Sequence, residues 1–140
     1  MRRIYWDTMV FVYLFEGNPK YANRVAEIYT RMQKRADVLC VSPLVFAEVL
    51  TGPTITQDVD GQKAITDFFH SSEVAVVPFS MEAAPTFARL RAAGVRSADA
   101  MHIATATVGK VDLFITNDKG LTKLSLPGLP FIASLETDIF

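Results

Sequence analysis

Four short apolar runs restrict the fold of this chain more than any other feature of its sequence. They lie at residues 4–6, 38–41, 74–77 and 113–116, and none alternates between polar and apolar residues. A strand that is apolar on both faces is typical of a parallel sheet covered on both sides. Segments of helical character separate the runs. The sequence therefore predicts an α/β fold, with a central parallel sheet of four to five strands flanked by helices.

One predicted helix has explicit start and stop signals. Ser42 is a favoured helix cap, and Pro43 directly after it is a favoured first helical residue. The pair Gly52-Pro53 disfavours helical continuation. We therefore expect a helix over residues 43–50 that ends before this pair, followed by a polar loop over residues 54–60.

The remaining elements are predicted from apolar spacing and composition. Ser97 is expected to cap an alanine-rich helix over residues 98–108. Pro85 predicts a late start or a kink in the helix expected over residues 80–92. The other expected elements are helices at residues 8–15, 20–35 and 62–70, a short helix from about residue 119, and a last strand near residues 130–133.

Length and composition narrow the class of protein. A chain of 140 residues fits one domain over residues 1–140, and its net charge of −1 gives no bulk attraction to nucleic acid or to an anionic membrane. No apolar run approaches the roughly 18 residues that a membrane span needs. The single cysteine, Cys40, excludes an intrachain disulfide and fits a reducing compartment. We expect a cytoplasmic protein without a membrane segment.

Four acidic residues stand at positions that suggest a shared site. Asp7 and Asp118 follow strands, and Asp99 lies in the first turn of a helix, so each has an ordinary explanation as a cap or a dipole partner. Glu48 differs, because its helix is otherwise apolar and offers it no local cation. A buried carboxylate is usually paired or bound to a metal, although an exposed apolar helix face would leave Glu48 simply solvated.

The predicted topology brings these acids together. In a parallel sheet, strands end and crossover helices begin at one edge, where ligands bind. Carboxylates gathered there repel one another, and a divalent cation relieves the repulsion. A set of oxygen ligands without cysteine suits Mg²⁺ or Mn²⁺, and such an ion is well suited to the hydrolysis of phosphate esters.

Four segments together resemble the motifs of PIN domains, and their order and intervals are most similar to the VapC-type toxins of toxin–antitoxin pairs. The segments are Asp7-Thr8, residues 43–50 with Glu48, Ser97-Ala98-Asp99-Ala100-Met101-His102-Ile103-Ala104, and Thr116-Asn117-Asp118. The resemblance implies a metal-dependent endoribonuclease that is inhibited by a cognate antitoxin and is often dimeric. It implies that Asp7, Glu48, Asp99 and Asp118 bind the metal and catalyse cleavage of RNA, and that Thr116 supplies a supporting hydroxyl.

Several observations leave alternatives open. Met9 stands where the family often has a small polar residue, which, with the near-neutral charge, favours a second hypothesis: a catalytically weak RNA- or protein-binding module. A nuclease acting on structured DNA is a third. His102, one helical turn after Asp99, either orients that acid or a water, or is a satisfied core group, the more frequent case. Arg96 and Lys119 either contact substrate phosphates or are solvated. The apolar residues 10–15 predict a homodimer.

Overall fold

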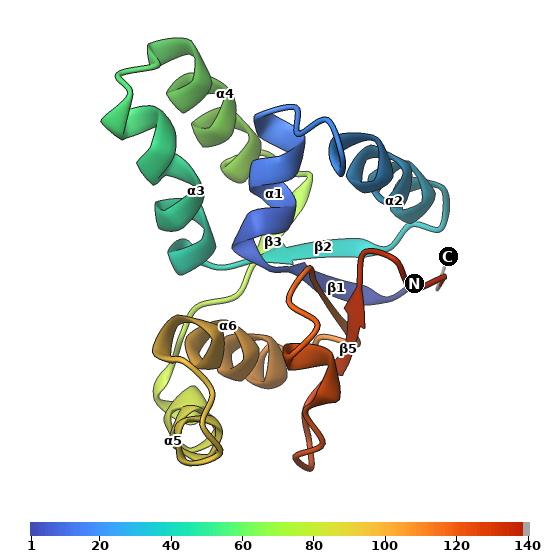
Figure 1. Cartoon of the computed structure of the whole chain (residues 1–140), viewed down its shortest axis with the longest axis vertical. Helices are drawn as coiled ribbons and strands as arrows, with labels where there is room; N and C mark the ends of the chain where they lie inside the picture. The colour runs from blue at the N-terminus through green and yellow to red at the C-terminus, as the bar shows by residue number, and fades with distance from the viewer. Residues whose placement is uncertain (139–140) are drawn as a thin grey trace.

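The computed structural model describes residues 1–138, and a five-stranded sheet forms its centre (Figure 1). The predicted domain extends to residue 140, and its last two residues lie outside the described part. All neighbouring strands are parallel, in the order β3-β2-β1-β4-β5, which confirms the predicted α/β fold. The strands are β1 (Arg3–Trp6), β2 (Val38–Val41), β3 (Val74–Val76), β4 (Leu113–Thr116) and β5 (Phe131–Ser134).

Six α-helices and two short 3₁₀ helices connect the strands in the described part of the chain. The helices α1 to α4 cover one side of the sheet, and α5 and α6 lie on the other (Figure 1). None of the helices within residues 1–138 has the length and apolar character that crossing a membrane requires. The helices are α1 (Thr8–Phe15), α2 (Ala22–Lys34), α3 (Pro43–Ile55), α4 (Val59–Phe69), η1 (Met81–Ala83), α5 (Ala84–Ala92), α6 (Ser97–Val108) and η2 (Leu121–Lys123).

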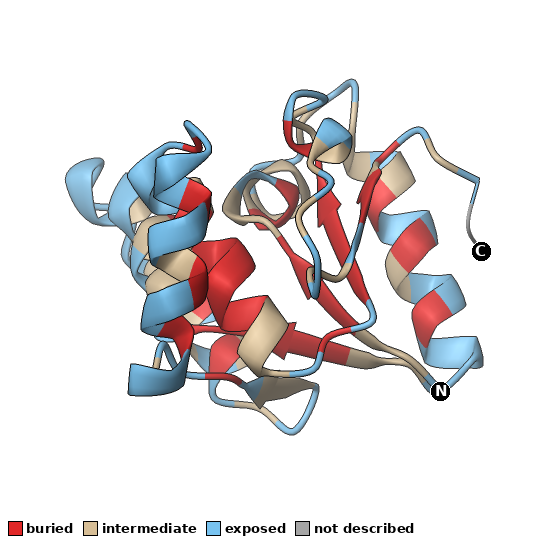
Figure 2. Cartoon of the chain, turned by 90° about the horizontal axis from the view of Figure 1, so that it is seen from below, coloured by how far each residue is buried: buried red, intermediate tan, exposed pale blue. Residues whose placement is uncertain are grey.

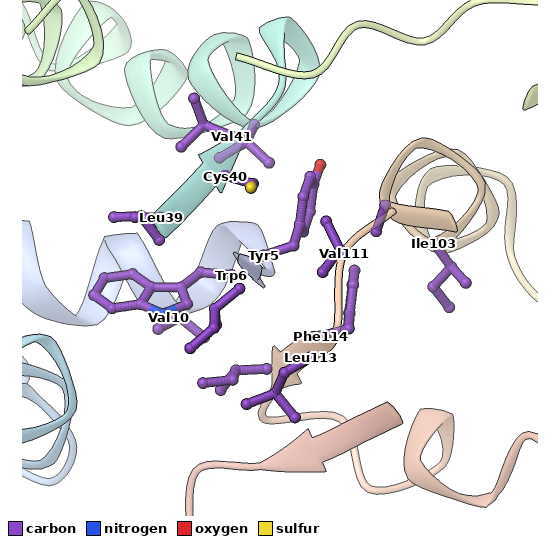
Figure 3. Close-up of a cluster of buried hydrophobic side chains, with 14 of the residues drawn as sticks. Tyr5, Trp6, Val10, Leu39, Cys40, Val41, Ile103, Val111, Leu113 and Phe114 are labelled. Carbon is purple, nitrogen blue, oxygen red and sulfur yellow. The ribbon is translucent and has the colours of Figure 1, made fainter. Parts of the chain in front are cut away.

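The strand β1 lies at the middle of the sheet and is buried on both faces. Its residues Tyr5 and Trp6 point to opposite sides (Figure 3), and both are fully buried. The Tyr5 ring stacks on Phe114 of β4, with ring centroids 5.3 Å apart. The Trp6 ring packs against Phe11 of α1 at 4.9 Å. Figure 2 shows that the burial follows the sheet, whereas the outer faces of the helices are exposed. The lack of alternation in these strands thus reflects cover from two helical layers.

The predicted end of α3 is wrong, because the helix continues through Gly52-Pro53 to Ile55. Pro53 removes one backbone donor, but Gly52 keeps a negative φ, so neither residue forces the chain out of the helix. The chain turns at Gln57, whose φ is +56°, and Asp58 then caps α4. The stretch predicted as a loop over residues 54–60 therefore holds the end of α3, a short turn and the start of α4. Packing of α3 against α4 outweighs the local preference of these residues.

Substitution of Gly52 by Ala tests this boundary. Outside its chain neighbours and the backbone of its own helix, a Cβ at Gly52 would meet only Glu16 Oε1, at an ordinary contact distance of 3.5 Å. Since the residue lies inside a helix, we expect G52A to raise the free energy of unfolding by about 0.5–1 kcal/mol, measured by urea denaturation. Gly94 is the matched control: its φ is +91°, so G94A should lower stability. Because Gly52 precedes Pro53, which disfavours a Cβ in the helical region, only a loss of stability as large as that of G94A would contradict the helical placement.

Several other helix starts differ from the predicted ones, among them that of α2, which begins at Ala22 rather than at residue 20. The N-cap of α6 is Arg96, with no side-chain hydrogen bond, and Ser97 is the first helical residue rather than the cap. The helix α4 begins at Val59, before the predicted residue 62, because Asp58 accepts a hydrogen bond from Gly61 N and starts it early. Pro85 is tolerated near the start of α5, which follows the 3₁₀ turn η1, so the predicted late start is confirmed.

Candidate active site

A cavity of about 330 Å³ opens at the carboxyl edge of the sheet, and all four predicted acids line it. Asp7 directly follows β1, and Asp118 follows β4 by two residues. Glu48 lies in the second turn of α3, and Asp99 in the first turn of α6. The structure therefore brings together four acids that lie far apart in the sequence. The other lining residues are Thr8, Met9, Tyr13, Arg96, Ala98, His102, Thr116 and Asn117.

Asp7 is both the cap of α1 and a member of this cavity. Its Oδ1 accepts a hydrogen bond from Thr8 N at 2.8 Å, and its Oδ2 accepts one from Thr116 Oγ1 at 2.9 Å. Burial raises the pKa of the Asp7 carboxyl, and these two hydrogen bonds oppose the rise. The expected cap is confirmed, and each carboxylate oxygen retains a lone pair that a cation can use.

Thr116, the last residue of β4, connects two of the acids. Its hydroxyl donates to Asp7 and accepts from the backbone N–H of Asp118 at 3.0 Å. Thr116 is fully buried, so this arrangement is protected from water. Asp118 in turn accepts from Gly120 N at 2.9 Å, which holds the turn after β4. The residue predicted to supply a supporting hydroxyl thus fixes the relative positions of Asp7 and Asp118.

Glu48 has a partner that lies on another helix. Its Oε1 accepts a hydrogen bond from Thr8 Oγ1 at 2.8 Å and lies 2.5 Å from His102 Nε2. The Glu48 side chain is 35% exposed, so it is neither fully buried nor simply solvated. His102 is buried and both of its ring nitrogens have hydrogen-bond partners, as expected of a core histidine. The acid that it contacts is Glu48 rather than Asp99. No local spacing indicated the contribution of Thr8.

Arg96 forms the positive part of the cavity. Its guanidinium lies 3.4 Å from Asp99 Oδ2 and 3.7 Å from Asp118 Oδ2, while its side chain remains 82% exposed. Lys119 turns away and pairs with Glu136 at 3.2 Å. Arg96 is therefore the cation that stands between two of the acids, and its high exposure leaves it free to reorient.

The chemistry of these side chains fits a hard divalent cation. Carboxylate oxygens are the preferred ligands of Mg²⁺ and Mn²⁺, and the cavity contains no thiol. Within residues 1–138, however, no three acidic, histidine or cysteine side chains lie close enough together to bind one metal ion. Arg96 neutralises Asp99 and Asp118 in this arrangement. A divalent cation held by Asp99 and Asp118 would supply the positive charge that Arg96 supplies here.

Comparison with known families gives one extensive match. A family model described as the PIN domain matches residues 4–126, which include all four acids and Thr116. A comparison with curated protein sequences finds none that is similar.

Several solved structures share the fold at low sequence identity. VapBC2 from Rickettsia felis, bound to a promoter DNA fragment, is 17% identical with a TM-score of 0.74, covering 94% of this chain and 98% of that one. DNA-bound VapBC from Salmonella typhimurium is 20% identical with a TM-score of 0.71, covering 96% and 99%. VapC20 from Mycobacterium tuberculosis, a sarcin–ricin loop cleaving toxin, is 14% identical with a TM-score of 0.67, covering 87% and 96%. At these identities the likeness concerns the fold.

Proposed function

Because this chain belongs to the PIN domain family, we propose that it is a metal-dependent endoribonuclease and the toxin of a toxin–antitoxin pair. The observation that carries the proposal is the gathering of Asp7, Glu48, Asp99 and Asp118 around one cavity at the carboxyl edge of the sheet. The similar fold of VapC20, which cleaves the sarcin–ricin loop, supports RNA as the substrate. A catalytically weak binding module is the alternative.

The four acids would hold one or two ions of Mg²⁺ or Mn²⁺. When bound, such an ion lowers the pKa of water and stabilises the charge of the leaving oxygen. The chain's own groups supply position: Thr116 fixes Asp7 and the Asp118 backbone, and His102 with Thr8 fixes Glu48. We expect products with a 5′-phosphate and a 3′-hydroxyl.

Arg96 would bind the phosphate of the substrate. The net charge of −1 supplies no general attraction to RNA, so local cations must hold it. A metal ion that binds Asp99 and Asp118 would release the Arg96 guanidinium from both. The guanidinium lies at the cavity and is suited to paired hydrogen bonds with a phosphate.

Metal removal tests the proposed activity directly. Purified protein should cleave single-stranded RNA with Mg²⁺ or Mn²⁺ present, and EDTA should reduce the rate by at least about 100-fold, since the charge at the phosphate then lacks compensation. Restoration by added Mn²⁺, measured on gels with mass spectrometry of the product ends, is the control for irreversible damage. Absence of Mn²⁺ binding at millimolar concentration, with the four acids intact, would favour the binding module instead.

We also propose a cognate antitoxin as partner, acting with this protein in the cytoplasm. A second cavity of about 440 Å³ lies between α1, α3 and α4, and α1 and α3 also line the acidic cavity. Its walls combine apolar side chains with polar groups, among them the acids Glu16 and Asp58. A segment with apolar and basic side chains would fit this groove and reach the adjacent acids. The solved VapBC structures of similar fold support a partner of this kind.

A homodimer remains a prediction, but its basis changes. Residues 10–15 of α1 are largely covered within the chain; Phe11, for example, packs on Phe68 and Phe69 of α4. We place the contact instead at the exposed apolar residues Val76 and Phe79, which lie next to the start of α3, and at Met81. Light scattering at micromolar concentration should give about twice 15.5 kDa, and the F79E variant should be monomeric. A monomeric wild-type protein would contradict this.

A further inference from the structure

A series of hydrogen bonds links the start of α3 to β1, β1 to α6, and α6 back to Glu48 in α3. The backbone N–H of Val45 donates to Ser42 Oγ at 3.2 Å, and Ser42 Oγ lies 2.7 Å from the Tyr5 hydroxyl. The Tyr5 hydroxyl lies 2.8 Å from His102 Nδ1, and His102 Nε2 lies 2.5 Å from Glu48 Oε1. Ser42, Tyr5 and His102 are each at most 2% exposed, so water does not compete for these bonds.

Counting donors and acceptors gives this series a direction. An ionised Glu48 has no proton to give, so the hydrogen between it and His102 belongs to Nε2. In a neutral imidazole Nδ1 is then an acceptor, and the Tyr5 hydroxyl must donate to it. A tyrosine hydroxyl is both a donor and an acceptor, so it can give its hydrogen to Nδ1 and accept one from Ser42. Ser42 in turn donates to the Tyr5 oxygen and accepts from Val45 N.

The opposite direction leaves a group unsatisfied. If Nδ1 carried the hydrogen, Tyr5 would have to donate to Ser42, whose oxygen already accepts from Val45 N. The Ser42 hydroxyl hydrogen would then have no acceptor among residues 1–138, although the side chain is buried. An unsatisfied buried hydroxyl is unfavourable. The direction that starts at Val45 N satisfies every member.

We propose that Ser42 and Tyr5 fix His102 as the Nε2–H tautomer, and that His102 thereby positions Glu48 for a divalent cation. His102 holds Oε1 together with Thr8, while Oε2 of Glu48 has no protein partner within residues 1–138. His102 is thus a positioning residue, since it acts through Glu48. The role toward the cation rests on the proposed function, whereas the tautomer does not. Outer hydrogen bonds of this kind orient ligands and tune their affinity for the metal.

The tautomer is measured by long-range ¹H–¹⁵N NMR of the metal-free protein at neutral pH. The chain contains two histidines, so the H70Q variant assigns the His102 signals. We expect a neutral His102 with its hydrogen on Nε2. The Y5F variant, which lacks the donor to Nδ1, should show a mixture of tautomers. The Tyr29 hydroxyl bonds Glu73 at the surface, so Y29F is the matched control and should resemble wild type. A charged or Nδ1–H His102 in wild-type protein overturns the proposal without requiring any variant.

Mn²⁺ affinity, measured by calorimetry, tests the positioning of Glu48. Loss of an outer hydrogen bond weakens metal binding about 10–100-fold, so Y5F and H102N should show this loss, whereas Y29F should not. H102Q can place an amide N–H near the position of Nε2 and should bind more tightly than H102N. Equal Mn²⁺ affinity in all variants overturns the positioning role of His102 but leaves the proposed function in place. A wild-type protein that binds no Mn²⁺ and cleaves no RNA overturns the proposed function and the metal role, and the NMR result still decides the tautomer.

Discussion

Replacement of Asp7 by Asn is expected to lower the rate of RNA cleavage about 1000-fold, a loss of roughly 4 kcal/mol of transition-state stabilisation. Asn cannot supply the charge that holds a cation, and its amide would meet the Thr116 hydroxyl, which now donates to Asp7 Oδ2. Cleavage is measured with Mn²⁺ in excess. D60N, at an exposed residue in the first turn of α4, is the matched control and should cleave like wild type. Undiminished cleavage by D7N would contradict the assignment of the site.

The stability of the same variant should depend on pH in a predictable way, which separates its effect on activity from misfolding. Burial raises the pKa of the Asp7 carboxyl above its ordinary value of 3.8. The contribution of this group to the stability of the protein is therefore fully present below pH 3.8. It is lost as the pH rises through the higher pKa of the folded state. D7N has no such loss. The unfolding free energy of D7N relative to wild type should therefore rise as the pH increases above 3.8 and then level off. Urea denaturation in EDTA measures this difference.

Replacement of Phe11 by Ala is expected to cost about 3–5 kcal/mol of unfolding free energy, because the ring is fully buried. Phe11 packs against Trp6 at 4.9 Å and against Phe69 at 5.1 Å, and so ties α1 to the sheet and to α4. Trp6 is the single tryptophan, and its fluorescence reports unfolding at this contact. F131A is the control, since Phe131 is 63% exposed and its loss should change stability by less than about 0.5 kcal/mol. Equal stability of the two variants would contradict the packing of α1.

The sheet and the gathering of the acids follow from local patterns. Non-alternating strands are recognisable because cover on both faces removes any need for polar side chains. Once the strands are known to be parallel, the positions of Asp7 and Asp118 at their ends determine that they share an edge. Asp99 and Glu48 follow, because crossover helices begin at that edge. The structure confirms this gathering in a single cavity.

The contacts made between distant segments could not be predicted in the same way. The bond between His102 and Glu48 joins residues 54 positions apart, and nothing in either helix specifies the other. Arg96 lies near Asp118 only because the start of α6 meets the end of β4. The continuation of α3 through Pro53 likewise depends on packing against α4, which outweighs local preference. These features depend on tertiary contacts, which a local pattern does not encode.

The central position of β1 has a consequence for when the protein becomes active during its synthesis. Asp7 is made long before β4, yet its backbone N–H donates to Ile115 O and its carboxylate accepts from Thr116, which lies 109 residues later. Contacts between such distant residues form late, because the intervening chain must first be ordered. A nascent chain in which β4 has not yet been made lacks Asp118 and also Thr116, whose hydroxyl positions Asp7. The proposed nuclease activity therefore begins only after β4 and Asp118 have been translated.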